Sequence, residues 1–175
     1  MIKLIIGGAR SGKSRYAEQL ATASKKSVLY IATATAIDDE MRARIAHHQQ
    51  QRPASWKLIE SQLDLVDVLI EESSKHQTIL VDCLTLWLNN QLFHFPNQDF
   101  SNLFDSLISC VRASTADIIF VANEVGLGII PLGEINRRFV DEAGRLNQQL
   151  AAAADEVFFI SAGLPLPLKT QGNLS

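Results

Sequence analysis

The residues Gly7-Gly8-Ala9-Arg10-Ser11-Gly12-Lys13-Ser14 follow directly behind the short apolar run 2–6. Their pattern, a glycine, four residues and then Gly-Lys-Ser, is typical of a phosphate-binding loop. Glycines let the backbone curl so that several N–H groups point at phosphate oxygens, beside the positive end of the following helix. We expect Lys13 to reach the β- and γ-phosphates and the Ser14 hydroxyl to bind Mg²⁺. The apolar run before the loop and the helical pattern after it argue against a chance match, so the stretch predicts a nucleotide site.

The whole chain has the composition of one folded domain. It has 175 residues, of which 47% are apolar and 20% are charged, so we expect a single domain over residues 1–175. A net charge of −3 and a pI near 5.8 give no electrostatic footprint for nucleic acid. We expect no signal peptide, because the glycine loop follows Met1 within a few residues, and no membrane insertion, because no apolar run approaches the roughly 18 residues of a membrane helix. Cys83 and Cys110 lack CxxC spacing, so we expect reduced thiols and a cytoplasmic protein.

Short apolar runs alternate with helical patterns along the rest of the chain. We expect strands at residues 28–32, 56–60, 78–82, 117–122 and 157–160, and helices at about 14–24, 38–51, 63–70, 84–92, 100–111 and 134–154. The closing residues 164–168 can form only an edge strand or an extended tail, because Pro165 and Pro167 lack N–H groups. The alternation predicts an α/β fold with a mostly parallel sheet and helices on both faces.

Ligands of such sheets bind outside the carboxyl ends of the strands. That rule brings together the phosphate loop and the segments 32–35, 82–84 and 123–128. Asp82 ends an apolar strand, where it can orient Mg²⁺ or cap the following helix; we favour the metal role because the phosphate loop requires a cation. Glu60, at the end of another expected strand, can accept hydrogen bonds from a nucleotide or remain a plain surface residue.

The neighbouring histidines 47 and 48 fall on an expected helix. Adjacent helical side chains point about 100° apart, so both cannot face one ligand. On a helical wheel His48 shares a face with Met41 and Ile45, whereas His47 continues a polar stripe, and Arg44 lies between the two histidines. Taken alone, a solvated helix face explains the pair better. Near a triphosphate, however, a neutral imidazole can attack phosphorus and form a covalent intermediate, which favours His47.

Four stretches of the sequence resemble one enzyme family. They are GGARSGKSRYAE at 7–18, DDEMRARIAHH at 38–48, NEVGLGIIP at 123–131 and AGRLNQQLAAAADEV at 143–157. The chain is similar, over nearly its whole length, to the bifunctional adenosylcobinamide kinase/adenosylcobinamide-phosphate guanylyltransferase family of cobalamin assembly. The resemblance implies a P-loop NTPase-like (RecA-like) fold, a homotrimer, and Mg²⁺ with GTP and ATP as substrates. It also implies phosphorylation of adenosylcobinamide, then GMP transfer from GTP to the new phosphate through a guanylylated histidine.

The same resemblance implies site residues, position by position. His47 becomes guanylylated and Lys13 serves both reactions. Ser14 and Asp82 hold the metal. The residues that bind nucleotide are Gly7, Gly8, Ala9, Arg10, Ser11, Gly12, Lys13, Ser14, Ala32, Thr33, Ala34, His48, Gln49, Gln50, Gln51, Glu60 and Asp82.

Two other functions need fewer of these residues. A monofunctional small-molecule kinase needs only the phosphate loop and Asp82, and its histidines would be incidental. A non-catalytic nucleotide-binding switch needs only loops that move when triphosphate binds. A histidine-linked GMP adduct distinguishes the transferase from both.

Overall fold

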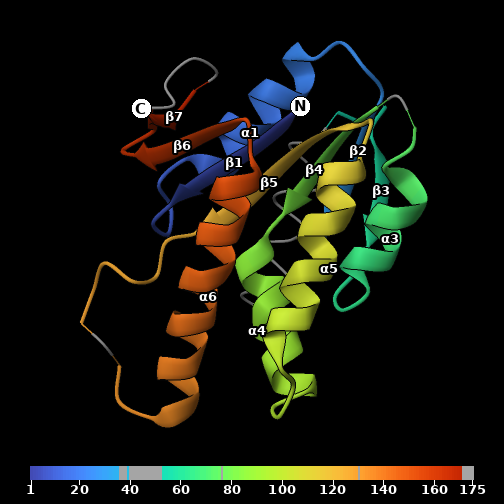
Figure 1. Cartoon of the computed structure of the whole chain (residues 1–175). Coiled ribbons are helices and arrows are strands. Elements are labelled where there is room, and N and C mark those ends of the chain that lie inside the picture. Colours follow the sequence, from blue (N-terminus) through green and yellow to red (C-terminus); the bar gives the residue numbers. More distant parts are fainter. Residues whose placement is uncertain (36–38, 40–52, 76, 130, 171–175) are drawn as a thin grey trace.

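The structure, a computed structural model, describes residues 1–35, 39, 53–75, 77–129 and 131–170 (Figure 1). Within this part of the chain, seven strands form one sheet in the spatial order β3-β2-β4-β5-β1-β6-β7. All neighbouring strands are parallel except β6 and β7, which confirms the predicted mostly parallel sheet. The strands are β1 (Ile2–Gly7), β2 (Val28–Ala32), β3 (Lys57–Glu60), β4 (Thr78–Asp82), β5 (Asp117–Asn123), β6 (Glu156–Ser161) and β7 (Leu164–Lys169).

Helices cover both faces of the sheet. They are α1 (Lys13–Ala23), α3 (Leu65–Glu72), α4 (Leu84–His94), α5 (Phe100–Ala113) and α6 (Glu134–Ala153) among the described residues. The larger apolar cluster joins the sheet to α3, α4, α5 and α6, and the smaller one joins it to α1. In Figure 1, α4, α5 and α6 lie in front of the sheet. The helix expected at 38–51 falls almost entirely outside the described residues.

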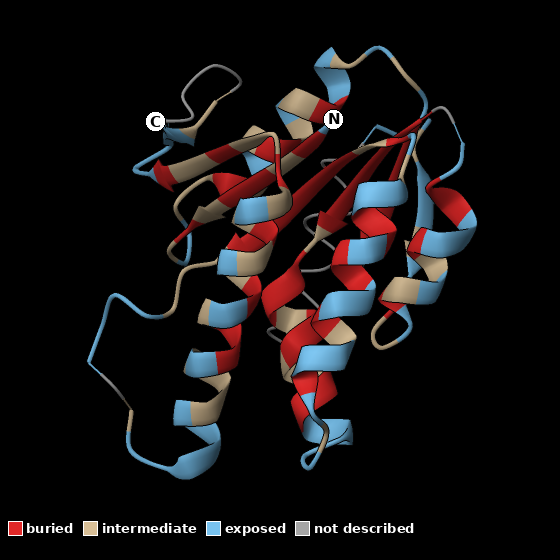
Figure 2. Cartoon of the chain, in the orientation of Figure 1, coloured by how far each residue is buried: buried red, intermediate tan, exposed pale blue. Residues whose placement is uncertain are grey.

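The two apolar clusters follow from strand alternation. Along β4, Ile79 and Val81 belong to the larger cluster and Leu80 to the smaller one, because successive side chains point to opposite faces. The central strands are therefore buried on both sides, as the strands coloured red in Figure 2 show. This two-sided burial explains why their sequences are continuous apolar runs. None of the described helices is long and apolar enough to cross a membrane.

The carboxyl-terminal strand β7 is the edge of the sheet, paired antiparallel with β6. Its prolines, Pro165 and Pro167, are two residues apart, so their missing N–H groups fall on one side of the strand. An edge strand needs no donors on its free side, which makes the two prolines compatible with pairing. A two-residue turn joins β6 to β7, and both turn residues, Ala162 and Gly163, have positive φ. Of the two predictions for this segment, the edge strand is the one that the structure shows.

Candidate nucleotide site

The phosphate loop connects the end of β1 to the start of α1, as the sequence predicts. Arg10 and Gly12 have φ values of 55° and 95°, which turn the backbone back on itself. The Ser11 N–H donates to the Gly8 carbonyl at 3.3 Å, and the turn between β6 and β7 adds a bond from the Gly163 N–H to the Ser11 carbonyl at 2.8 Å. The loop is therefore supported both by its own backbone and by a turn 150 residues away.

Lys13 begins α1 and its side chain is buried. Its ammonium donates to the Gly8 carbonyl at 3.2 Å. Burial lowers the pKa of Lys13, and the nearby acidic groups Cys83 and Asp82 oppose this shift. Because the Cys83 thiol is itself neutral at pH 7, we assign the opposing effect at that pH to Asp82. A buried cation close to a loop of backbone amides suits an anionic phosphate group.

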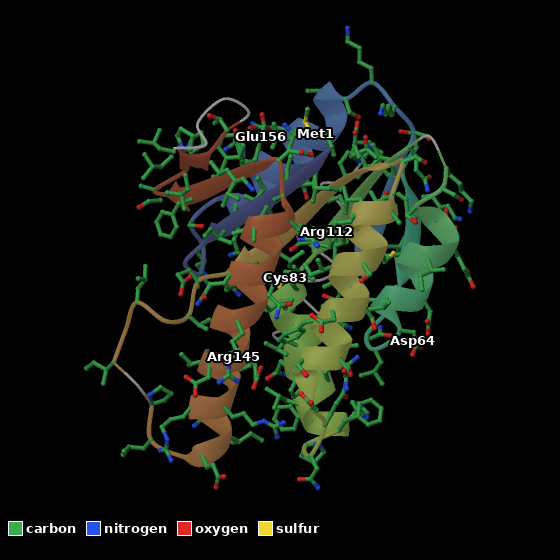
Figure 3. All side chains as sticks on the ribbon, viewed as in Figure 1. Met1, Asp64, Cys83, Arg112, Arg145 and Glu156 are labelled. Carbon is green, nitrogen blue, oxygen red and sulfur yellow. The ribbon has the colours of Figure 1, made fainter. Side chains whose placement is uncertain are left out.

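Asp82 and Cys83 follow the last apolar residue of β4. The Oδ2 atom of Asp82 accepts a hydrogen bond from the Tyr30 hydroxyl at 3.0 Å. The N-cap residue of helix α4 is Cys83 and not Asp82, so Asp82 does not occupy the cap position that the sequence also allowed. Cys83, labelled in Figure 3, is buried in the interior of the molecule. Burial, with the charge of Asp82, raises the pKa of its thiol to about 11, so at neutral pH it is not a nucleophile.

The ends of four parallel strands meet at one edge of the sheet. In the strand register Ala32 lies opposite Asp82, and Gly7 lies opposite Asn123. Backbone bonds continue this pairing past the strands, from the Glu124 N–H to the Gly7 carbonyl at 3.0 Å and from the Thr33 N–H to the Asp82 carbonyl at 3.3 Å. The phosphate loop, 32–35, 82–84 and the start of 123–128 thus share this edge, as the topology rule predicts.

Thr33 joins the ends of β2 and β4. Its fully buried hydroxyl donates to the Cys83 carbonyl at 2.7 Å and accepts from the Cys83 N–H at 2.9 Å. Ala32 and Ala34 flank it and are half-buried. Glu60 is exposed at the end of β3, opposite Ala32 in the register, and therefore lies at the same edge. The structure brings these residues to the phosphate-loop end of the sheet.

The remaining predicted residues lie outside the part of the chain that the structure describes. They are His47, His48, Gln49, Gln50 and Gln51.

Sequence reasoning missed the contact between Tyr30 and Asp82. Tyr30 lies inside the apolar run of β2, where burial of its ring is enough to explain an aromatic residue. Its partner is 52 residues further along the chain, so no local pattern carries the signal. The sequence predicts that Thr33 lies in the site, but it does not predict the two hydrogen bonds between its hydroxyl and the backbone of Cys83.

The fold and the loop define the class: this is an α/β protein of the P-loop nucleotide-binding type. The RadB recombinase has a similar fold, with a TM-score of 0.54 and 14% identity over 90% of this chain and 73% of that one. The P4 protein from bacteriophage phi6, solved in complex with ADP, has a TM-score of 0.51 and 14% identity over 94% of this chain and 52% of that one. At such low identity these likenesses concern the fold alone.

The family follows from the sequence comparisons. The profile of the family described as cobinamide kinase / cobinamide phosphate guanyltransferase matches residues 3–168, and the chain belongs to this family. It is 50% identical to the bifunctional adenosylcobalamin biosynthesis protein CobP of Pseudomonas aeruginosa, over 97% of this chain and 98% of that protein. It is 40% identical to the bifunctional adenosylcobalamin biosynthesis protein CobU of Escherichia coli, over 97% of this chain and all of that protein. The resemblance read from the sequence, and the two transferase activities expected from it, are confirmed.

Proposed function

We propose that this chain phosphorylates adenosylcobinamide and then transfers GMP from GTP to the product, giving adenosylcobinamide-GDP, at a single nucleotide site on the carboxyl edge of the sheet. The observation that carries this proposal is the shared edge of the phosphate loop and Asp82. A triphosphate held at this edge can then serve both the phosphorylation and the GMP transfer.

The phosphate loop holds the triphosphate in both reactions. Backbone N–H groups of residues 7–14 and the buried ammonium of Lys13 face negative oxygens, and the positive end of α1 adds to their attraction. The water-poor setting of Lys13 strengthens this interaction relative to one at an exposed lysine. Ala32, Thr33, Ala34 and Glu60 would border the rest of the nucleotide, together with residues 48–51.

Ser14 and Asp82 would hold Mg²⁺. Both offer oxygen atoms, which are the ligands that Mg²⁺ prefers, and phosphates with water complete its shell in sites of this kind. Among the described residues no three His, Cys, Asp or Glu side chains gather as a metal cage. When bound, Mg²⁺ neutralises phosphate charge and stabilises the charge that develops as a phosphoryl group is transferred.

The first reaction is a phosphoryl transfer. The aminopropanol hydroxyl of adenosylcobinamide attacks the γ-phosphorus, the bond from that phosphorus to its bridging oxygen breaks, and a nucleoside diphosphate leaves. The hydroxyl proton is released. Lys13 stabilises the charge that develops on the transferred group.

The second reaction has two displacements. A neutral nitrogen of His47 attacks the α-phosphorus of GTP, and pyrophosphate leaves. A phosphate oxygen of adenosylcobinamide phosphate then attacks the same phosphorus, and the bond to His47 breaks. Splitting the transfer in this way replaces one difficult displacement by two easier ones.

The mass of the intact protein tests this function. After incubation with GTP and Mg²⁺ and then denaturation, the wild-type chain and His48→Ala should carry a GMP-sized, acid-labile adduct. His47→Ala should carry none, because it lacks the attacking nitrogen. An adduct of equal yield on His47→Ala would contradict the assignment.

The same mass measurement, combined with an assay of adenosylcobinamide phosphorylation and of triphosphate binding, separates the alternatives. A chain that phosphorylates adenosylcobinamide but never gains an adduct acts as a kinase without the histidine route. A chain that binds triphosphate but neither phosphorylates nor gains an adduct acts as a switch.

We also propose a homotrimer in the cytoplasm. The loop between β5 and α6 supports the assembly, since its side chains Leu127, Ile129 and Leu132 are 79%, 99% and 91% exposed. Several large apolar side chains on one projecting loop are typical of a surface that another chain covers.

A further inference from the structure

The Tyr30 hydroxyl is the one described side chain seen to bond the proposed metal carboxylate, and the mechanism above does not use it. Strands β2 and β4 are neighbours, and Ala32 lies opposite Asp82. Tyr30 therefore stands two residues before the position opposite Asp82, on the same face of the sheet. Its hydroxyl spans this diagonal and donates to Oδ2 of Asp82 at 3.0 Å.

The ring of Tyr30 is held in place. Tyr30 is buried in the smaller apolar cluster, with Leu80 and the α1 residues Ala17 and Ala21. It also stacks on Trp56, with 6.5 Å between ring centroids and 29° between ring planes. A ring fixed by packing gives its hydroxyl a fixed position, so the bond to Asp82 restrains the carboxylate rather than following it.

We propose that Tyr30 is a positioning residue for the metal site. Its hydroxyl engages Oδ2 and so sets the rotation of the Asp82 carboxylate, which leaves Oδ1 to bind Mg²⁺ or a water of its shell. Hydrogen bonds from a second residue to a metal-binding carboxylate commonly act this way, and their loss costs about 10- to 100-fold in metal affinity. The inference rests on the proposed function, because it requires the metal at Asp82.

Metal affinity is the readout that separates this role from a purely structural one. Tyr30→Phe keeps the ring and its stacking on Trp56 and removes only the hydroxyl. If that hydroxyl merely satisfies a partly buried carboxylate, the variant loses stability but binds metal as before. If the hydroxyl positions the carboxylate, metal binding weakens even where the variant is fully folded.

The experiment is a Mn²⁺ titration of the chain saturated with a non-hydrolysable GTP analogue, followed by the electron paramagnetic resonance signal of free Mn²⁺. Mn²⁺ stands in for Mg²⁺ because it also binds oxygen ligands. Asp82→Asn serves as the reference. Tyr16→Phe is the matched control: the Tyr16 ring packs edge-on against Phe158, and among the described residues the hydroxyl bonded to Asp82 is that of Tyr30.

We expect Tyr30→Phe to raise the Mn²⁺ dissociation constant about 10-fold, Asp82→Asn to raise it at least as much, and Tyr16→Phe to leave it unchanged. Nucleotide affinity without metal should stay constant in Tyr30→Phe, and thermal unfolding should show that the variant is folded. If Tyr30→Phe binds Mn²⁺ as tightly as the wild type while Asp82→Asn binds it weakly, the inference is overturned but the assignment of Asp82 to the metal site is retained. Wild-type binding by Asp82→Asn would overturn the metal assignment and the inference with it.

Discussion

Gly7 ends β1 at a place where a side chain has no room. A Cβ atom there would lie 2.5 Å from the Ile160 carbonyl oxygen and 2.8 Å from the Ser11 Oγ. The Ile160 carbonyl belongs to the backbone of the neighbouring strand β6, so it cannot move away as a side chain could. The glycine therefore lets the phosphate loop start in contact with β6.

This predicts unequal effects for two adjacent glycines. Gly7→Ala should lower the free energy of unfolding by about 1–3 kcal/mol, the usual cost of overpacking. Gly8→Ala is the matched control: nothing lies within 4 Å of its Cβ position, so the change should stay within about 0.5 kcal/mol. Urea unfolding of both variants measures the difference, and equal losses would contradict this account of the loop.

The positions of the phosphate loop and Asp82 at strand ends could be predicted from the sequence, because both follow short apolar runs. The hydrogen bond of Tyr30 could not be predicted, because its partner is distant along the chain. The pKa of Cys83 was equally out of reach, since it depends on burial that only packing creates.

Helix α4 holds the chain segments that directly follow β2 and β3. The Asn90 side-chain amide donates to the Thr33 carbonyl at 2.9 Å and to the Gln62 carbonyl at 3.2 Å. At the next position of α4, the Gln91 amide donates to the Leu63 carbonyl at 2.7 Å. These bonds satisfy backbone carbonyls where regular strand pairing has ended.

Removing the Asn90 amide should therefore destabilise the protein. We expect Asn90→Ala to lower the free energy of unfolding by about 1–3 kcal/mol, because two carbonyls lose their donor. Asn89→Ala, at the preceding position of α4, removes neither bond and should stay within about 0.5 kcal/mol. Denaturant unfolding tests the pair, and equal stability of both variants would show that water replaces the amide without loss.

Glu72, at the end of α3, makes stability depend on pH. Its carboxylate accepts from Lys75 at 2.7 Å, from Lys57 at 3.0 Å and from Gln77 at 3.1 Å. The bond from Lys75, with those from Lys57 and Gln77, lowers the pKa of Glu72 to about 2, against an opposing effect of burial. The folded state therefore favours the ionised carboxylate.

The sign of the pH effect follows. The contribution is complete above the ordinary pKa of 4.5 and is lost as the pH falls from there towards about 2. The wild-type protein should lose stability between pH 7 and pH 3 as Glu72 is protonated, and Glu72→Gln should lose less. Because both lysines are more than half exposed, we expect the two losses of unfolding free energy to differ by only about 1 kcal/mol. Chemical unfolding at the two pH values gives this difference; an unchanged pH slope in Glu72→Gln would exclude the ion pairs as its source.

The strands and helices themselves were largely predictable. Buried parallel strands are continuous apolar runs, and Pro165 with Pro167 confined the last segment to an edge. Hydrogen bonds such as those of Asn90 were not predictable, because a polar side chain on a helix gives no sign of which distant carbonyl it meets.

In the whole molecule the predicted site residues that the structure describes share the carboxyl edge of the sheet, and the apolar loop with Leu127 and Leu132 projects from the end of β5 at that edge (Figure 1). If that loop is covered by neighbouring chains, the particle in solution should have about three times the 19.3 kDa mass of one chain. Sedimentation equilibrium measures this mass. Replacing Leu127 and Leu132 by Asp should shift it towards one chain, since charge in an apolar interface costs desolvation. A wild-type mass of one chain at high concentration would contradict the trimer.

For the molecule as a whole, topology explains what sequence could predict. The rule that ligands bind at the carboxyl ends of parallel strands is enough to predict that the loop, Thr33, Asp82 and Asn123 lie together. The surfaces that hold a corrinoid follow no such rule, because they depend on exposed side chains and on chain assembly.

The central claim is that one phosphate loop serves both transfers, and Lys13→Ala tests it most directly. Phosphorylation of adenosylcobinamide and the GMP adduct formed with GTP should be measured on the same folded preparation, with the exposed α1 residue Arg15 changed to Ala as control. We expect both rates to fall by about 100-fold or more, since both lose the cation that stabilises transferred phosphate, and both to persist in Arg15→Ala. A folded Lys13→Ala chain that loses phosphorylation but gains the GMP adduct at the wild-type rate would contradict the shared site.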